Sequence, residues 1–103
     1  MKFPTMIDIE QIYDFFEKLK KKYEELSTHI KFPEYSISIP ESKEEFNSLF
    51  ENLKWNNIYN ISFFVKQKFI IKFDFLKEEI IIKSELPELY KQVEELITKS
   101  FFK

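Results

Sequence analysis

The chain of 103 residues contains no Gly, Ala, Arg or Cys and a single histidine, His29, and its formal net charge is −2 at pH 7. Without glycine it cannot form the glycine-rich loops that bind dinucleotides or nucleoside triphosphates, because these loops approach phosphate closely at positive φ. Without cysteine or arginine it has no disulfide, thiolate nucleophile, thiolate metal site or bidentate guanidinium. We therefore expect no catalytic, cofactor-binding or metal site, and a protein that is not an enzyme.

The composition also bears on the source of the protein. The abundant residues, Lys, Ile, Phe, Glu and Asn, have AT-rich codons, which indicates an AT-rich genome, although enrichment in Lys and Glu is also typical of hyperthermophiles. A small protein of this kind without visible chemistry suggests a virus or another mobile element. No apolar run approaches the roughly 20 residues of a membrane span. We expect a cytoplasmic protein, in the host cell cytoplasm if the source is viral, with no membrane partner.

The first predicted element is a long helix over about residues 6–28, with Thr5 and Asp8 as an N-cap signature. Its apolar residues recur at alternating spacings of three and four, a heptad pattern that we call the heptad seam: Ile9, Ile12, Phe16, Leu19, Tyr23, Leu26 and Ile30. A wide apolar stripe is typical of a globular core and a narrow one of a coiled-coil partner. Lysines and glutamates flank the second half of the seam and make its apolar stripe narrow. The seam is therefore either part of the core or an interface between chains.

A short strand is predicted over about residues 35–39, where apolar residues alternate with serines. Ser42 and Glu45 then form a capping-box pattern that starts a helix reaching about residue 54. Trp55 follows at the corner between this helix and the next strand. It is either a core anchor or a binding hot spot.

Three strands with tight links predict an antiparallel meander over about residues 58–65, 68–76 and 79–83. One face of this meander is strongly apolar and is assigned to the core: Tyr59, Ile61, Phe63, Val65, Phe69, Ile71, Phe73, Phe75, Ile80 and Ile82. The other face mixes polar residues with five large apolar ones: Ile58, Phe64, Ile70, Leu76 and Ile81. That second face is too apolar to be simply solvated, so we expect something to cover part of it.

A final helix is predicted over about residues 86–102, with Pro87 acceptable in its first turn. Of the two terminal aromatic residues, Phe101 and Phe102, only one can follow the buried stripe of this helix. The whole chain is predicted to be a single α+β domain of residues 1–103, with the long first helix and an α+β body over about 35–103. The predicted order is α-β-α-β-β-β-α, with about four strands: the meander and the one short strand.

The titratable residues have plain structural interpretations. A lone histidine such as His29 near a helix end is commonly a surface residue or a partner of the helix dipole. The acids between residues 8 and 17 complement the dipole of the first helix in the same way. The lysines of residues 20–22 are opposed by nearby glutamates, which favours helical ion pairs over phosphate contacts.

The remaining feature with functional meaning is unburied apolar surface. A homodimer is the simplest way to bury it, so we expect a small non-enzymatic interaction module that pairs with itself and, if viral, also binds a host protein. The predicted interface lies on the seam, the second sheet face and the C-terminus: Phe16, Leu19, Tyr23, Leu26, Phe64, Ile70 and Phe102. The alternative is a small nucleic-acid-binding regulator using the lysines of the sheet: Lys66, Lys68, Lys72, Lys77 and Lys83.

Overall fold

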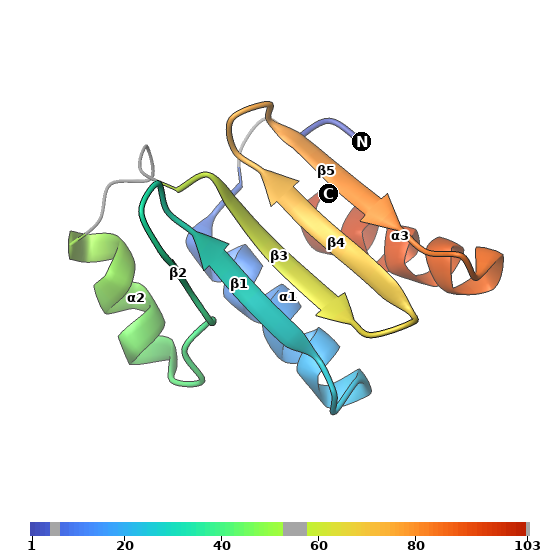
Figure 1. Cartoon of the computed structure of the whole chain (residues 1–103), viewed down its shortest axis with the longest axis horizontal. Helices are drawn as coiled ribbons and strands as arrows, with labels where there is room; N and C mark the ends of the chain where they lie inside the picture. The colour runs from blue at the N-terminus through green and yellow to red at the C-terminus, as the bar shows by residue number, and fades with distance from the viewer. Residues whose placement is uncertain (5–6, 53–57, 103) are drawn as a thin grey trace.

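A computed structural model describes residues 1–4, 7–52 and 58–102 of the chain, and Trp55 lies outside the described residues. Within them one antiparallel sheet has the strand order β2-β1-β3-β4-β5 (Figure 1). The elements are α1 (Ile9–Lys22), β1 (Ser27–Lys31), β2 (Ser36–Ile37), α2 (Lys43–Asn52), β3 (Asn60–Val65), β4 (Phe69–Asp74), β5 (Glu79–Lys83) and α3 (Pro87–Phe101). The α+β class with three helices is confirmed, and the described sheet has five strands rather than about four.

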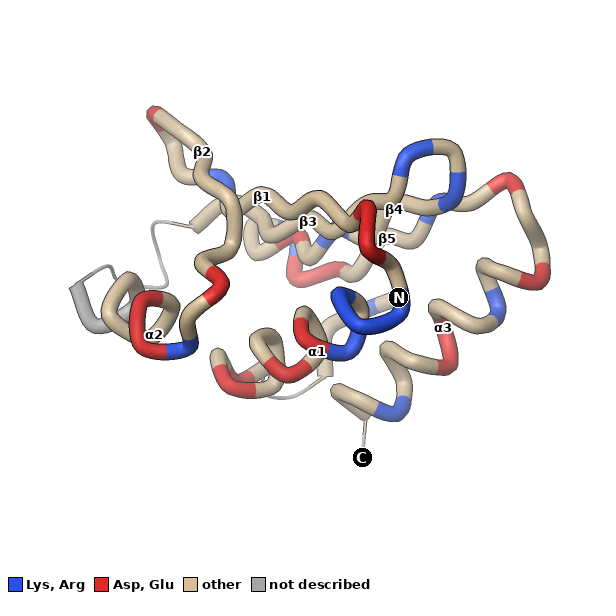
Figure 2. Tube along the Cα trace, turned by 90° about the horizontal axis from the view of Figure 1, so that it is seen from below, with Lys and Arg blue, Asp and Glu red and all other residues tan. Residues whose placement is uncertain are grey.

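The molecule has two layers, and all three helices described lie on the same side of the sheet. Figure 2 shows the sheet edge-on, with α1, α2 and α3 beneath it. In Figure 1 the reader looks onto the opposite side of the sheet, which no described helix covers. We call that side the outer face. Among the described helices, none is long and apolar enough to cross a membrane.

The first helix starts later and ends earlier than the predicted range of about 6–28, and Thr5 of the predicted cap lies outside the described residues. Its start is capped by Asp8, whose side chain accepts the N–H of Glu10 while Gln11 accepts the N–H of Asp8 in return, a complete capping box. The helix ends at Lys22, and the residues predicted to continue it form strand β1.

Strand β1 replaces the last part of the predicted helix because its side chains alternate between core and solvent. Thr28 and Ile30 are buried, whereas Ser27, His29 and Lys31 are exposed. The Thr28 hydroxyl accepts the N–H of Ile39, and β1 pairs with β3 along its whole length. Ile30 thus reaches the core from a strand, so the prediction of a heptad seam through residue 30 is wrong.

The remaining boundaries fall close to their predicted positions. The three strands of the meander are confirmed within two residues at each end, and β5 matches its predicted range. Helix α2 begins after Ser42, whose hydroxyl accepts the N–H of Glu45 at 3.3 Å. Strand β2 covers only Ser36–Ile37, shorter than the predicted 35–39, and the chain turns tightly before it, where the N–H of Phe32 donates to the carbonyl of Tyr35.

The core is built from large aromatic side chains that α1 and α3 press against the inner face of the sheet. Phe15 of α1 is fully buried, and its ring lies 5.3 Å from the rings of both Phe63 and Phe101 and 5.9 Å from that of Phe73. These contacts are edge-on, the geometry that aromatic rings prefer. A chain without Gly or Ala fills the space between helix and sheet with rings of this size.

The two hairpin turns of the meander use left-handed backbone without glycine. Gln67 has φ of 65° in the β3–β4 turn and Glu78 has φ of 55° in the β4–β5 turn. The first turn closes with the N–H of Lys68 donating to the carbonyl of Val65 at 3.0 Å. A residue with a Cβ adopts this conformation at a cost of about 1–2 kcal/mol, so both turns carry local strain.

Replacing Gln67 by glycine should therefore raise the free energy of unfolding by about 0.5–1 kcal/mol, the relief of strain less the extra entropy of an unfolded glycine. Urea denaturation followed by circular dichroism measures this difference. The matched control is Lys66→Gly in the same turn, where φ is not positive and the substitution should destabilise by about the same amount. Equal destabilisation by both substitutions would contradict the argument.

Candidate interaction surface

The outer face is a grid set by the strand pairings. Three rows of residues cross β1, β3, β4 and β5. The first row is Lys31, Asn60, Asp74 and Glu79. The second is His29, Ser62, Lys72 and Ile81, and the third is Ser27, Phe64, Ile70 and Lys83. The presence of His29 and Lys31 on this face was not predicted from the sequence, because the first helix was expected to reach about residue 28 and no strand was expected before residue 35. The alternation of Thr28 and Ile30 was the signal for the strand.

Apolar side chains lie on β3, β4 and β5 of the grid. Ile70 is 47% exposed, and Phe64 and Ile81 are half-buried. The imidazole of His29 stacks on the ring of Phe64, with 5.6 Å between centroids and 14° between planes. Two other residues predicted on this face are elsewhere. Ile58 precedes β3 and is buried, and Leu76 lies in the β4–β5 turn. We expected something to cover part of this face, but within the described part of the chain no helix lies on this side of the sheet.

Charges of both signs lie on the grid. In the first row Lys31 lies on β1, whereas Asp74 and Glu79 lie on β4 and β5. The Asp74 carboxylate also accepts the N–H groups of Leu76 and Lys77 and so stabilises the β4–β5 turn. Lys2 pairs with Glu79 in an isolated antiparallel bridge, and Lys72 and Lys83 lie on the same strands as the two acids. The face thus offers charges of both signs to a partner, without separate cationic and anionic regions.

A hollow of about 510 Å³ borders the outer face at the β3–β4 turn, which rises on that side (Figure 2). Phe64, Ile70 and Lys83 line it together with the turn itself. Beside the turn, the ammonium group of Lys68 donates to the carboxylate of Glu25 at 3.0 Å. That hydrogen bond lowers the pKa of Glu25 below its ordinary value.

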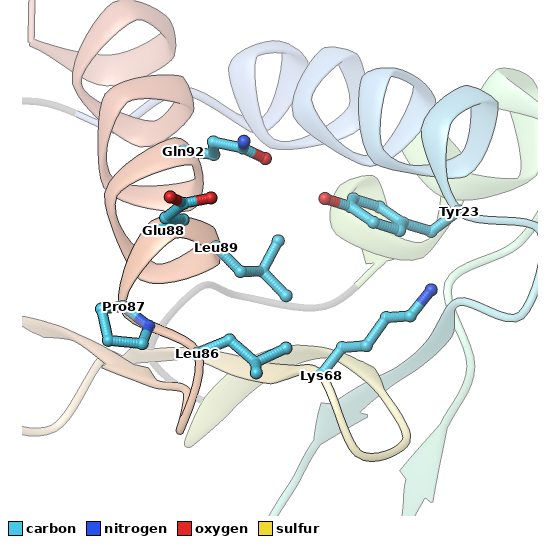
Figure 3. A pocket seen from close by; sticks show the side chains of 7 residues that line it. All are labelled: Tyr23, Lys68, Leu86, Pro87, Glu88, Leu89 and Gln92. Carbon is cyan, nitrogen blue, oxygen red and sulfur yellow. The ribbon is translucent and has the colours of Figure 1, made fainter.

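A second hollow, of about 580 Å³, lies on the helix side between the end of α1, the β3–β4 turn and the start of α3 (Figure 3). Leu86 and Leu89 form an apolar wall, opposed by the ring of Tyr23, which packs on Phe69 at 5.1 Å. Lys68 closes one side. The hollow can hold a small apolar group, and its polar lining comes from Tyr23, Lys68 and two residues of α3, Glu88 and Gln92.

The structure places the predicted interface residues in two different settings. Phe16 and Leu19 are buried in the domain's own core, and Tyr23 and Leu26 are half-buried and packed against it. The part of the seam that lies on α1 is therefore internal, because this side of α1 faces the sheet. Phe64 and Ile70 lie together on the outer face. Phe102 is 37% exposed at the end of α3, while Phe101 is buried, as the helix stripe requires.

The lysines of the alternative nucleic-acid site are only partly brought together. Lys66 and Lys68 lie in the β3–β4 turn, and Lys72 and Lys83 lie on the outer face. Lys77 lies in the β4–β5 turn, at the other end of the strands. Four of the five lysines thus lie on or beside one face, and Lys77 is separated from them.

Among the described residues there is no group of three or more His, Cys, Asp or Glu side chains placed to hold a metal ion. Burial raises the pKa of the Tyr13 phenol, whose hydroxyl donates to the backbone carbonyl of Glu41 and so ties α1 to the segment before α2. This contact is structural. No protein-family model, curated protein or solved structure matches the chain.

Proposed function

We propose that this protein is a non-enzymatic interaction module that pairs with a second copy of itself through the outer face of its sheet. The observation that carries the proposal is an apolar patch on this face, formed by Phe64 and Ile70 in the third row and Ile81 in the second, on the side that no described helix covers. Polar and charged residues lie beside this patch, and protein interfaces commonly combine an apolar area with a polar surround.

The size of the face sets the expected strength of pairing. Four strands spaced about 4.8 Å apart and about six residues long span roughly 15 by 20 Å. A stable dimer commonly buries about 800 Å² of accessible surface on each partner, which is more than this flat area supplies. We therefore expect a weak dimer whose population depends on protein concentration.

Sedimentation velocity over a range of concentrations tests the proposal. The apparent mass should rise from the 12.7 kDa of one chain towards twice that value as concentration increases. High salt should not abolish this rise in apparent mass, because burial of the apolar patch contributes most of the affinity. A mass that stays at 12.7 kDa up to the highest attainable concentration would refute self-association.

One observation favours a second candidate, binding of single-stranded nucleic acid on the same face. The His29–Phe64 stack offers an aromatic platform, and Lys72 and Lys83 lie beside it. Proteins that bind single strands combine aromatic stacking with a cationic surface. Fluorescence anisotropy with a labelled single-stranded oligonucleotide at low salt separates the candidates, since phosphate contacts weaken steeply as salt rises. Absence of any binding at low salt would remove this candidate.

A further inference from the structure

The β3–β4 turn rises on the outer side of the sheet and forms one wall of the hollow beside it (Figure 2). Phe64 and Ile70, neighbours in the third row, supply the apolar part of its lining. Lys66 of the turn and Lys83, opposite Ile70 on β5, also line it. Its volume of about 510 Å³ lies within the range of small-molecule sites, about 300–1,000 Å³. The hollow is therefore a recess that a small ligand can enter.

The Phe64 ring is covered on one side only by the contacts described above. His29 lies in the second row, and its imidazole stacks on Phe64 at a centroid distance of 5.6 Å, with 14° between the planes. The described residues that line the hollow belong to the third row, the turn and the segment after β5. A planar ring in the hollow can therefore pack on Phe64 from the side opposite His29, with Ile70 beside it. Stacking of this kind is favourable between aromatic side chains and nucleobases.

The charges around the hollow favour an anionic ligand. Within the described part of the chain, three lysines and one acid, Glu85, line it. Lys68 is paired with Glu25 at 3.0 Å. Lys66 and Lys83 form no ion pair among the described residues. Two such lysines against one glutamate leave an excess of one positive charge, and lysine binds phosphate as a point charge.

We infer that this hollow binds a nucleotide, with the base stacked on Phe64 and the phosphate against Lys66 and Lys83. Gln67 of the turn also lines the hollow, and its amide can donate and accept hydrogen bonds at the edge of the base. A free nucleotide and one unit of a single strand share this chemistry. For a strand the inference rests on the second candidate function, and for a free nucleotide it goes beyond both candidates. It does not depend on self-association.

Titration of isotope-labelled protein with adenosine monophosphate (AMP), followed by two-dimensional NMR in about 0.1 M salt, tests the inference. Amide signals of the β3–β4 turn and the third row should shift. The Kd of AMP should be about fivefold or more below that of adenosine, which lacks the phosphate. Raising the salt to about 1 M should remove most of this difference, because the phosphate contacts are then screened.

Substitutions in the hollow separate the two parts of the site. Phe64→Leu removes the ring but keeps an apolar side chain, and Lys83→Gln removes one cation. Each should raise the Kd of AMP about fivefold or more. The matched control is Lys77→Gln, which removes a cation from the β4–β5 turn at the other end of the strands and should change the Kd by less than about twofold. Thermal unfolding of each variant checks that the fold is intact.

A single-stranded oligoadenylate distinguishes the two sources of the ligand. If it binds more tightly than AMP and also shifts signals of the first row, the ligand is a strand and the second candidate function is supported. If it binds no more tightly than AMP, the ligand is a free nucleotide and the second candidate function is refuted.

The inferred site is wrong if millimolar AMP shifts no signal at the hollow, or if adenosine binds as tightly as AMP. Binding of the oligoadenylate without any shift at the hollow would refute the site while the second candidate function stands. Sedimentation velocity without nucleotide tests self-association separately, so its result leaves this inference unchanged.

Discussion

Replacing Phe15 by alanine should lower the free energy of unfolding by about 3–5 kcal/mol, the usual cost of removing a buried phenyl ring. Phe15 is fully buried and contacts the rings of Phe63, Phe73 and Phe101, so it joins α1, the sheet and α3 at one point. The free energy of unfolding of small domains is only about 5–15 kcal/mol, so this substitution should remove a large part of the stability. Urea denaturation followed by circular dichroism measures it.

The control is Phe102→Ala, which removes the same ring from a position that is 37% exposed. We expect it to change the free energy of unfolding by less than about 1 kcal/mol. The neighbouring Phe101 is buried against Phe15, so the two terminal aromatic residues should differ strongly when replaced in turn. A Phe15→Ala variant as stable as Phe102→Ala would contradict the central position of this ring cluster.

Replacing Ile70 by lysine should raise the dimer Kd about 30-fold or more, because truncating or charging a central interface residue commonly costs at least about 2 kcal/mol. Ile70 lies beside Phe64 in the third row of the outer face and is 47% exposed, so the substitution leaves the core intact. Sedimentation velocity at matched concentrations measures the change. The free energy of unfolding of the monomer should stay within about 0.5 kcal/mol of its original value.

Leu76→Lys is the matched control for this substitution. Leu76 is 69% exposed, more than Ile70, but it lies in the β4–β5 turn and not within the three rows of the outer face. If exposed apolar side chains associate without a defined interface, Leu76→Lys should weaken the dimer at least as much as Ile70→Lys. The proposed interface requires the reverse order of effects.

The meander illustrates what local patterns predict well. Alternating apolar and polar residues set the inner face of β3, β4 and β5, and short polar links set the two hairpins. Both signals depend on neighbouring residues, because side chains alternate between faces with a period of two. The position of Phe64 and Ile70 on the second face was predicted for the same reason.

The residues after α1 show where local patterns were insufficient. Residues 23–31 fit a heptad spacing and a strand alternation at once, since Leu26 and Ile30 satisfy the first and Thr28 and Ile30 the second. Pairing with β3 and the bond from Ile39 to Thr28 decide for the strand. Strand β3 and Ile39 lie further along the chain, so residues 23–31 by themselves could not decide between helix and strand. The placement of Lys31 and His29 on the outer face was missed with them.

The sequence by itself determined the α+β class, the meander, the capped start of α2, and the absence of glycine-, arginine- and cysteine-based chemistry, because each depends on composition or on residues a few positions apart. The tertiary structure decided that the α1 part of the heptad seam is core and that one face of the sheet carries no described helix. Which side of a sheet the helices cover depends on packing between distant elements, and in this protein that choice leaves Phe64, Ile70 and Lys31 on the surface available to a partner.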